Sequence, residues 1–95
     1  MKIKDLLTDE TKWTQDTNAR DDKNKAVGAT DPTACKWGLV AAVLLCYRPN
    51  GRHYGIFDSI CRRLNVANSA EINTWNNNPN RTFNDISKII EDLAI

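Results

Sequence analysis

The sequence predicts a mainly α-helical domain of four to five short helices around a central apolar helix, with an irregular N-terminal arm. Three observations predict this fold class. A chain of 95 residues has room for one hydrophobic core, so we expect a single domain over residues 1–95. Residues 34–47 are almost entirely apolar, which is typical of a buried helix. Apolar residues recur at helical spacing through much of residues 53–93.

In the N-terminal third, the residue pattern predicts one short helix followed by an arm. Three apolar residues within residues 3–7 stand at positions i, i+3 and i+4, enough for one or two helical turns. Residues 8–33 are mostly polar, with Trp13 and Val27 as their only large apolar residues. Because a long stretch without structure is unusual in a small domain, we expect an irregular loop or a small β-hairpin at about residues 13–29.

The central helix is predicted at about residues 34–47. Asp-Pro-Thr at residues 31–33 supplies a start signal, because Pro favours the first helical turn and Asp or Thr can accept its free amide protons. Nearly every face of the helix is apolar, which predicts that other helices surround it on all sides. Arg-Pro-Asn-Gly at residues 48–51 predicts the turn that ends it.

Two further helices are predicted after this turn. The first runs over about residues 53–65. Its apolar face consists of Tyr54, Ile56, Phe57, Ile60, Cys61 and Leu64. Asn68 followed by Glu71 resembles a capping box, and it predicts a second, short helix that buries Ile72 and Trp75.

The chain then reaches a segment unusually rich in asparagine. We call residues 75–82, W-N-N-N-P-N-R-T, the asparagine segment, and we expect a turn-rich loop at residues 76–80. Thr82 with Asp85 predicts the start of the last helix through a second capping box. The apolar stripe of this helix consists of Phe83, Ile86, Ile89, Ile90 and Leu93.

Composition and cysteine usage exclude several classes of protein. Thirteen basic and twelve acidic side chains leave a net charge of +1, which predicts no strong attraction of the whole molecule to nucleic acid or membrane. The N-terminus has no apolar run of signal length, so we expect a cytoplasmic setting and no membrane partner. The three cysteines, Cys35, Cys46 and Cys61, form no paired spacing, so we expect neither disulfides, nor a metal site, nor a cofactor.

Three short motifs together resemble a known family. They are Trp13-Thr14-Gln15, then C-x-W-x-L-x-x-A at residues 35–42, and Trp75-Asn76-Asn77 followed by Arg81-Thr82. The combination resembles small bacterial and phage-encoded domains of unknown function, in which a W-N-D loop ends in Arg-Thr. This chain has Asn77 where such relatives carry Asp, which argues against a catalytic or metal-binding carboxylate there. The resemblance implies a phage or mobile-element setting and no particular activity.

The strongest candidate site combines the arm with the asparagine segment. Its predicted partner-binding residues are Trp13, Gln15, Arg20, Asn76, Asn77, Asn78 and Arg81. The segment concentrates hydrogen-bonding groups in eight residues, and Arg81 precedes a predicted helix, where it could bind a carboxylate or phosphate. The alternative is that the asparagines close turns and cap helices while Trp75 anchors the loop to the core.

Two weaker sites are also predicted. A nucleic-acid-binding patch would use Arg48, Arg52, Arg62 and Arg63, although arginines in the last helical turn also favour the helix dipole without any ligand. A cysteine enzyme would use Cys35 near a helix start, with His53 as its base. Packing of Cys35 as a structural thiol is the alternative.

These patterns favour a non-enzymatic phage- or prophage-type interaction protein that binds and modulates a host macromolecule, for example as an inhibitor of host defence. The partner expected first is a protein. Nucleic acid is the alternative partner. The chain is expected to be a monomer or a homodimer, with the apolar stripe of the last helix either closing the core or pairing with a second copy.

Overall fold

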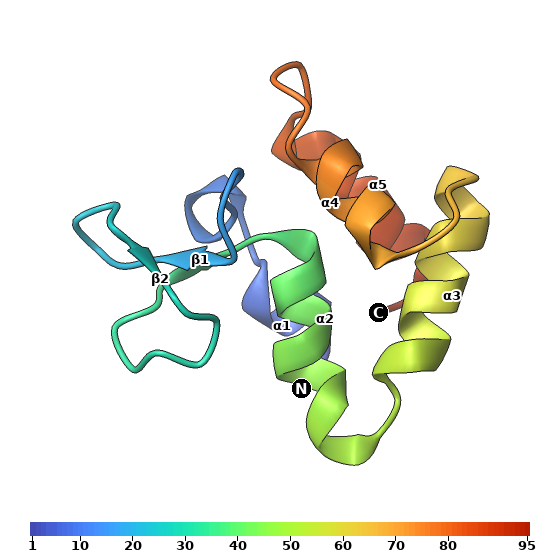
Figure 1. Cartoon of the computed structure of the whole chain (residues 1–95), viewed down its shortest axis with the longest axis horizontal. Coiled ribbons are helices and arrows are strands. Elements are labelled where there is room, and N and C mark those ends of the chain that lie inside the picture. The colour runs from blue at the N-terminus through green and yellow to red at the C-terminus, as the bar shows by residue number, and fades with distance from the viewer.

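The computed structural model describes all of residues 1–95, and it confirms a mainly α-helical fold with a small β arm (Figure 1). The elements are α1 (Ile3–Leu6), β1 (Ala19–Arg20), β2 (Ala26–Val27), β3 (Lys36–Trp37), α2 (Leu39–Tyr47), α3 (His53–Leu64), α4 (Ser69–Asn76) and α5 (Phe83–Leu93). Short 3-10 turns at Glu10–Lys12 and Arg48–Asn50 complete the chain. No helix is both long and apolar enough to cross a bilayer.

The predicted hairpin is present, and a third strand extends it. The three strands form an antiparallel sheet in the order β2-β1-β3. Ala19 pairs with Val27 on one side and with Trp37 on the other. In Figure 1 this sheet projects to one side of the helices. The arm therefore extends beyond the predicted residues 13–29 and spans residues 13–37.

The start predicted for the central helix is wrong, because α2 begins at Leu39 and not at residue 34. Asp31 accepts hydrogen bonds from the amide and the hydroxyl of Thr33, but these bonds only close a turn. The next residues pair with β1 instead, and the Cys35 amide donates to the Arg20 carbonyl at 2.9 Å. Pairing with a distant strand thus outweighs the local helix signal.

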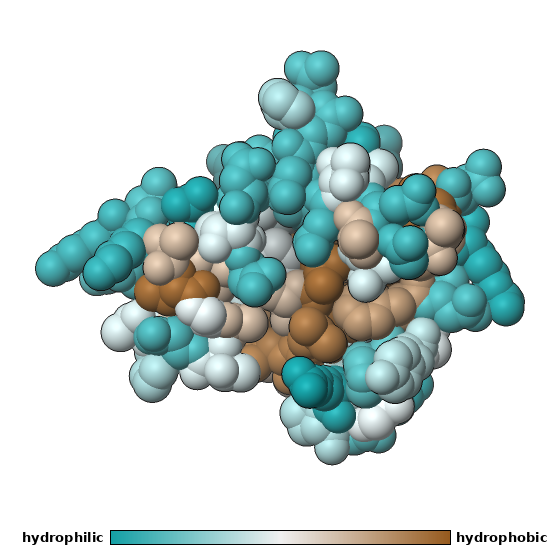
Figure 2. All heavy atoms as spheres, in the orientation of Figure 1, coloured by the Kyte–Doolittle hydropathy of each residue, from teal (hydrophilic) through white to brown (hydrophobic).

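Most of α2 lies in the core, but one flank reaches the surface. Its buried residues are Leu39, Val40, Ala41, Ala42, Val43, Cys46 and Tyr47. Leu44 and Leu45 are only half-buried, and Figure 2 shows apolar atoms at the surface over α2. The prediction that other helices surround this segment on all sides is therefore wrong, because Leu44 and Leu45 keep part of their surface accessible to solvent.

The predicted helices of the C-terminal half are confirmed with small corrections. Helix α3 ends at Leu64, one residue early, because Asn65 takes the left-handed conformation at φ 57° that ends many helices. The Asn68 side chain caps α4 by accepting from the Glu71 amide at 3.0 Å. Tyr54, which was placed on the apolar face of α3, is 77% exposed because it lies in the first turn, beyond the core.

Helix α5 carries the full predicted capping box and closes the core. The Thr82 amide donates to the Asp85 carboxylate at 3.0 Å, and the Asp85 amide donates to the Thr82 hydroxyl at 3.4 Å. Ile86, Ile89 and Ile90 are buried. Because both bonds are local, the sequence predicts this helix start directly.

Ile60 of α3 is fully buried in the core, and its truncation is expected to destabilise the domain strongly. We expect Ile60→Ala to lower the free energy of unfolding by about 2–5 kcal/mol, through lost burial and the cavity left behind. Urea denaturation measures this change. The control is Tyr54→Ala on the same helix, whose exposed ring predicts a change within about 0.5 kcal/mol. Equal effects of the two substitutions would contradict this packing.

Asp85 is expected to make the stability of α5 depend on pH. Its hydrogen bond from the Thr82 amide is the main cause that holds the pKa of Asp85 below its ordinary value of 3.8. The charged carboxylate therefore stabilises the fold at neutral pH, and this contribution is lost as pH falls through the folded-state pKa. In urea titrations, the stability difference between wild type and Asp85→Asn should shrink on acidification below about pH 4. A difference that grows in acid would contradict this role.

Candidate interaction site

The fold brings the arm and the asparagine segment together. The Trp13 indole N–H donates to the Asn76 side-chain oxygen at 2.8 Å, across 63 positions of sequence. The Gln15 side-chain amide donates to the carbonyls of Asn76 and Asn78, both at 2.8 Å. Five of the seven predicted partner-binding residues, Trp13, Gln15, Asn76, Asn77 and Asn78, thus meet at one junction.

The centre of this junction is Asn76, whose side chain is buried with only 1% of the residue exposed. Its oxygen accepts from the Trp13 indole and also from the Leu39 amide at 3.3 Å, at the start of α2. Its nitrogen donates to the Thr14 carbonyl at 3.2 Å and to the Asn77 side chain at 3.0 Å. All four hydrogen-bonding positions of the amide are therefore in use.

The junction also involves the backbone of Asp16 and packing by Trp13. Asp16 has φ 68°, a left-handed conformation that Asp tolerates better than most residues. Its amide donates to the Asn77 side-chain oxygen at 2.9 Å. The Trp13 ring lies 6.3 Å from the ring of Phe83, between centroids, so the arm also packs against α5. The arm is therefore attached to the helices by both polar and apolar contacts.

Arg20 holds the arm together from inside. Its Nε donates to the Thr14 hydroxyl at 2.8 Å, and its two Nη atoms donate to the carbonyls of Asn24 and Gln15, at 3.1 and 3.3 Å. Thr14 is buried. The three acceptors are all uncharged, so these bonds position the guanidinium group but leave its charge unpaired.

A polar hollow of about 300 Å³ opens beside Arg20 on the arm. Its lining consists of Trp13, Thr14, Gln15, Asp16, Arg20, Asn24 and Lys36. Three of the predicted partner-binding residues therefore share a concave surface. Sequence reasoning missed the other four, Thr14, Asp16, Asn24 and Lys36. Lys36 was missed because it was assigned to a helix, although the apolar–polar–apolar order of Cys35, Lys36 and Trp37 was an available signal for a strand, and the following Gly38 for a helix start.

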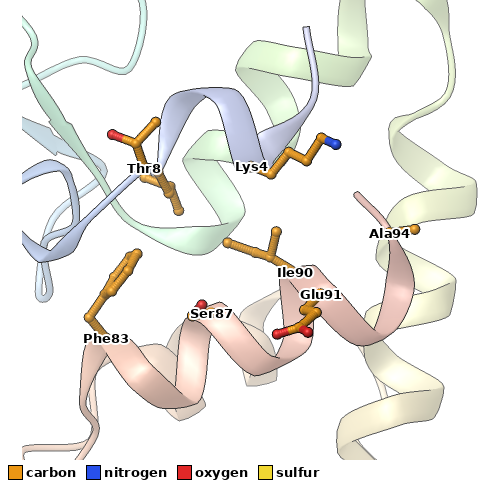
Figure 3. Close-up of a pocket in the computed structure, with 8 residues that line it drawn as sticks. Lys4, Thr8, Phe83, Ser87, Ile90, Glu91 and Ala94 are labelled. Atoms are coloured by element: carbon orange, nitrogen blue, oxygen red, sulfur yellow. The ribbon is translucent and has the colours of Figure 1, made fainter.

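A second hollow, of about 360 Å³, lies between α1 and α5 (Figure 3). Figure 3 shows Phe83 and Ile90 of α5 pointing toward the segment that carries Lys4 and Thr8. Leu7 also lines the hollow, together with polar groups such as Ser87. None of the sequence-predicted site residues lies here, so the candidate site remains the junction of the arm and the asparagine segment.

Arg81 is used within the fold. Its guanidinium group lies 4.0 Å from the centre of the Trp75 ring, in a cation–π contact. Its Nε donates to the Trp75 carbonyl at 3.0 Å, and one Nη lies 3.7 Å from the Asp85 carboxylate. These contacts within the chain compete with the predicted binding of a carboxylate or phosphate by Arg81. They also hold the asparagine segment in shape.

The four arginines of the predicted nucleic-acid patch separate into two pairs. Arg48 and Arg52 flank the turn before α3, whereas Arg62 and Arg63 stand in its last turn, about 15 Å along the helix axis from its start. Arg62 pairs with Asp58 at 3.0 Å, and Arg63 pairs with Asp92 at 2.8 Å. The two pairs form no single basic surface.

The premise of the predicted cysteine enzyme is wrong, since Cys35 precedes β3 and does not stand at the start of α2. His53 begins α3, beyond the far end of α2 (Figure 1). Burial raises the pKa of the Cys46 thiol and that of the Cys61 thiol above the ordinary 9.0. No three His, Cys, Asp or Glu side chains are grouped closely enough to hold a metal ion.

No protein-family model, curated protein or solved structure matches this chain. The motif resemblance therefore stays a prediction.

Removing the Asn76 amide should destabilise the domain, because buried groups on three elements lose their partner. We expect Asn76→Ala to lower the free energy of unfolding by about 2–4 kcal/mol, since each unpaired buried group costs about 1–3 kcal/mol. Urea denaturation followed by tryptophan fluorescence measures the change. Asn80→Ala, in the exposed part of the same segment, is the matched control and should stay within about 0.5 kcal/mol. A similar small change for Asn76→Ala would contradict the role of the junction.

Proposed function

We propose that this protein is a non-enzymatic interaction domain that binds and modulates a protein partner through the arm and the asparagine segment. The observation that carries the proposal is the junction at Asn76. It joins segments about sixty residues apart in sequence into one surface. Surfaces built in advance bind more tightly than flexible ones, because less conformational entropy is lost on association.

The junction separates positioning residues from residues that can contact a partner. The side chains of Trp13, Asn76 and Arg81 form hydrogen bonds with neighbours within the chain. Asn78 and Asn80 are exposed beside them. The Asn78 side-chain oxygen accepts from the Asn80 amide at 2.9 Å, which leaves the Asn78 side-chain N–H groups and the whole Asn80 side-chain amide for a partner. In this proposal the first group holds the surface in shape and the second group makes contacts with the partner.

The setting of this interaction rests on the motif resemblance alone. The resemblance supports a phage or prophage protein whose partner is a host macromolecule, including a host-defence factor. The alternative, nucleic-acid binding through residues 48–63, has less support because two of its four arginines are paired with carboxylates.

The surface is tested by affinity capture from a bacterial lysate with variants that alter only exposed residues. Asn80→Arg changes the asparagine segment, and Lys23→Glu changes the hairpin turn of the arm. We expect the wild-type protein to retain a specific protein and both variants to lose most of it. Ser59→Arg, on the exposed face of α3, is the matched control and should retain the same protein as wild type.

Circular dichroism of all three variants checks that the fold is intact. Two results would overturn the proposal. One is that folded wild-type protein retains nothing beyond the bare resin. The other is that Asn80→Arg and Lys23→Glu retain the same protein as fully as Ser59→Arg does.

A further inference from the structure

The register of the sheet places two cations directly opposite each other. Arg20 of β1 and Lys36 of β3 are paired in the antiparallel ladder. Directly opposite residues in such a ladder point to the same face, and like charges in this position destabilise a sheet. Both side chains line the polar hollow on the arm. The fold therefore concentrates positive charge in one concave place on a chain whose net charge is only +1.

Neither cation has a carboxylate partner within the chain. The ion pairs of the structure involve Asp58, Asp85 and Asp92, all of them on helices. Asp16 also lines the hollow, yet it forms an ion pair with neither Arg20 nor Lys36. Lys36 has a single long contact, 3.5 Å from its Nζ to the Asn24 side-chain oxygen. Within the chain, the two cations thus donate hydrogen bonds only to uncharged oxygen atoms.

Hydrogen bonds also hold Arg20 in place while leaving some of its N–H donors free. Its Nε and one N–H of each Nη are used by Thr14, Asn24 and Gln15. Of the five N–H groups of a guanidinium, this leaves one on each Nη. Two N–H groups on neighbouring nitrogens are the arrangement that binds carboxylate and phosphate groups in a bidentate manner. The anchored Arg20 therefore needs little further ordering to bind an anion.

We infer that Arg20 and Lys36 form an oxyanion-binding site on the arm, which takes one carboxylate or phosphate group of a ligand. Arg20 binds the anion through its two free N–H groups, and Lys36 supplies the second positive charge from the neighbouring strand. That the anion belongs to a protein partner rests on the proposed function, as an acidic or phosphorylated side chain of that partner. Binding of a small oxyanion does not depend on it.

The test is an NMR titration of the full chain with inorganic phosphate and, separately, with acetate. Sodium chloride at the same ionic strength is the reference for nonspecific salt effects. We expect the Arg20 Nε–H and the Lys36 amide resonances to shift saturably with at least one of the two anions. The anion that acts distinguishes a phosphate source from a carboxylate source, and either response supports the site.

Lys36→Gln is the decisive variant, because Lys36 makes only one long contact and its loss spares the Arg20 network. We expect it to weaken anion binding about tenfold, as for one lost charge-assisted hydrogen bond. Without added anion it should raise the melting temperature, because the cross-strand repulsion is removed. Lys25→Gln, an exposed neighbour outside the hollow, should change neither quantity.

Two outcomes would overturn the inference. In the first, neither anion shifts these resonances more than sodium chloride does. In the second, Lys36→Gln binds the anion as tightly as wild type. Failure of the affinity capture would leave the titration unaffected, and a failed titration would leave the captured protein unaffected, so the two proposals are judged separately.

Discussion

The structure depends on one buried amide, the side chain of Asn76. Its oxygen accepts from the Trp13 indole and from the first amide of α2, and its nitrogen donates to the Thr14 carbonyl. A buried polar group stabilises a fold only when all its partners are in place. The arm, the start of α2 and the end of α4 are therefore positioned by one another, and none of them can move without breaking hydrogen bonds of this side chain.

This constraint explains how a small, nearly neutral chain acquires a distinctive surface. Because the arm is held firmly, its three short strands keep their register, and the register sets Arg20 opposite Lys36. The positive site on the arm is thus a consequence of tertiary structure, which net charge and composition conceal. The exposed amides of the asparagine segment lie beside the same junction, so one polar network positions both parts of the proposed binding surface.

Local signals account for what the sequence could predict. The Asn68–Glu71 and Thr82–Asp85 patterns mark helix starts within four residues, and both helices begin there, with a full capping box at Thr82 and the side-chain cap alone at Asn68. Strand β3 escaped prediction because its pairing with β1 is not local, and the apolar character of residues 34–47 predicted a single helix. The asparagine segment was singled out as important, but composition could not show which asparagine is buried, because its partners come from the arm and α2.

Hydrogen exchange of the Trp13 indole N–H tests most directly whether the junction joins arm and helices into one unit. It is measured by NMR in increasing urea, beside the backbone amides of Leu39 and Ile60. We predict that all three protons exchange only through global unfolding, with the same free energy and the same urea dependence. Rapid, urea-independent exchange of the Trp13 indole while the Ile60 amide stays protected would contradict the account, because the arm would then open separately from the core.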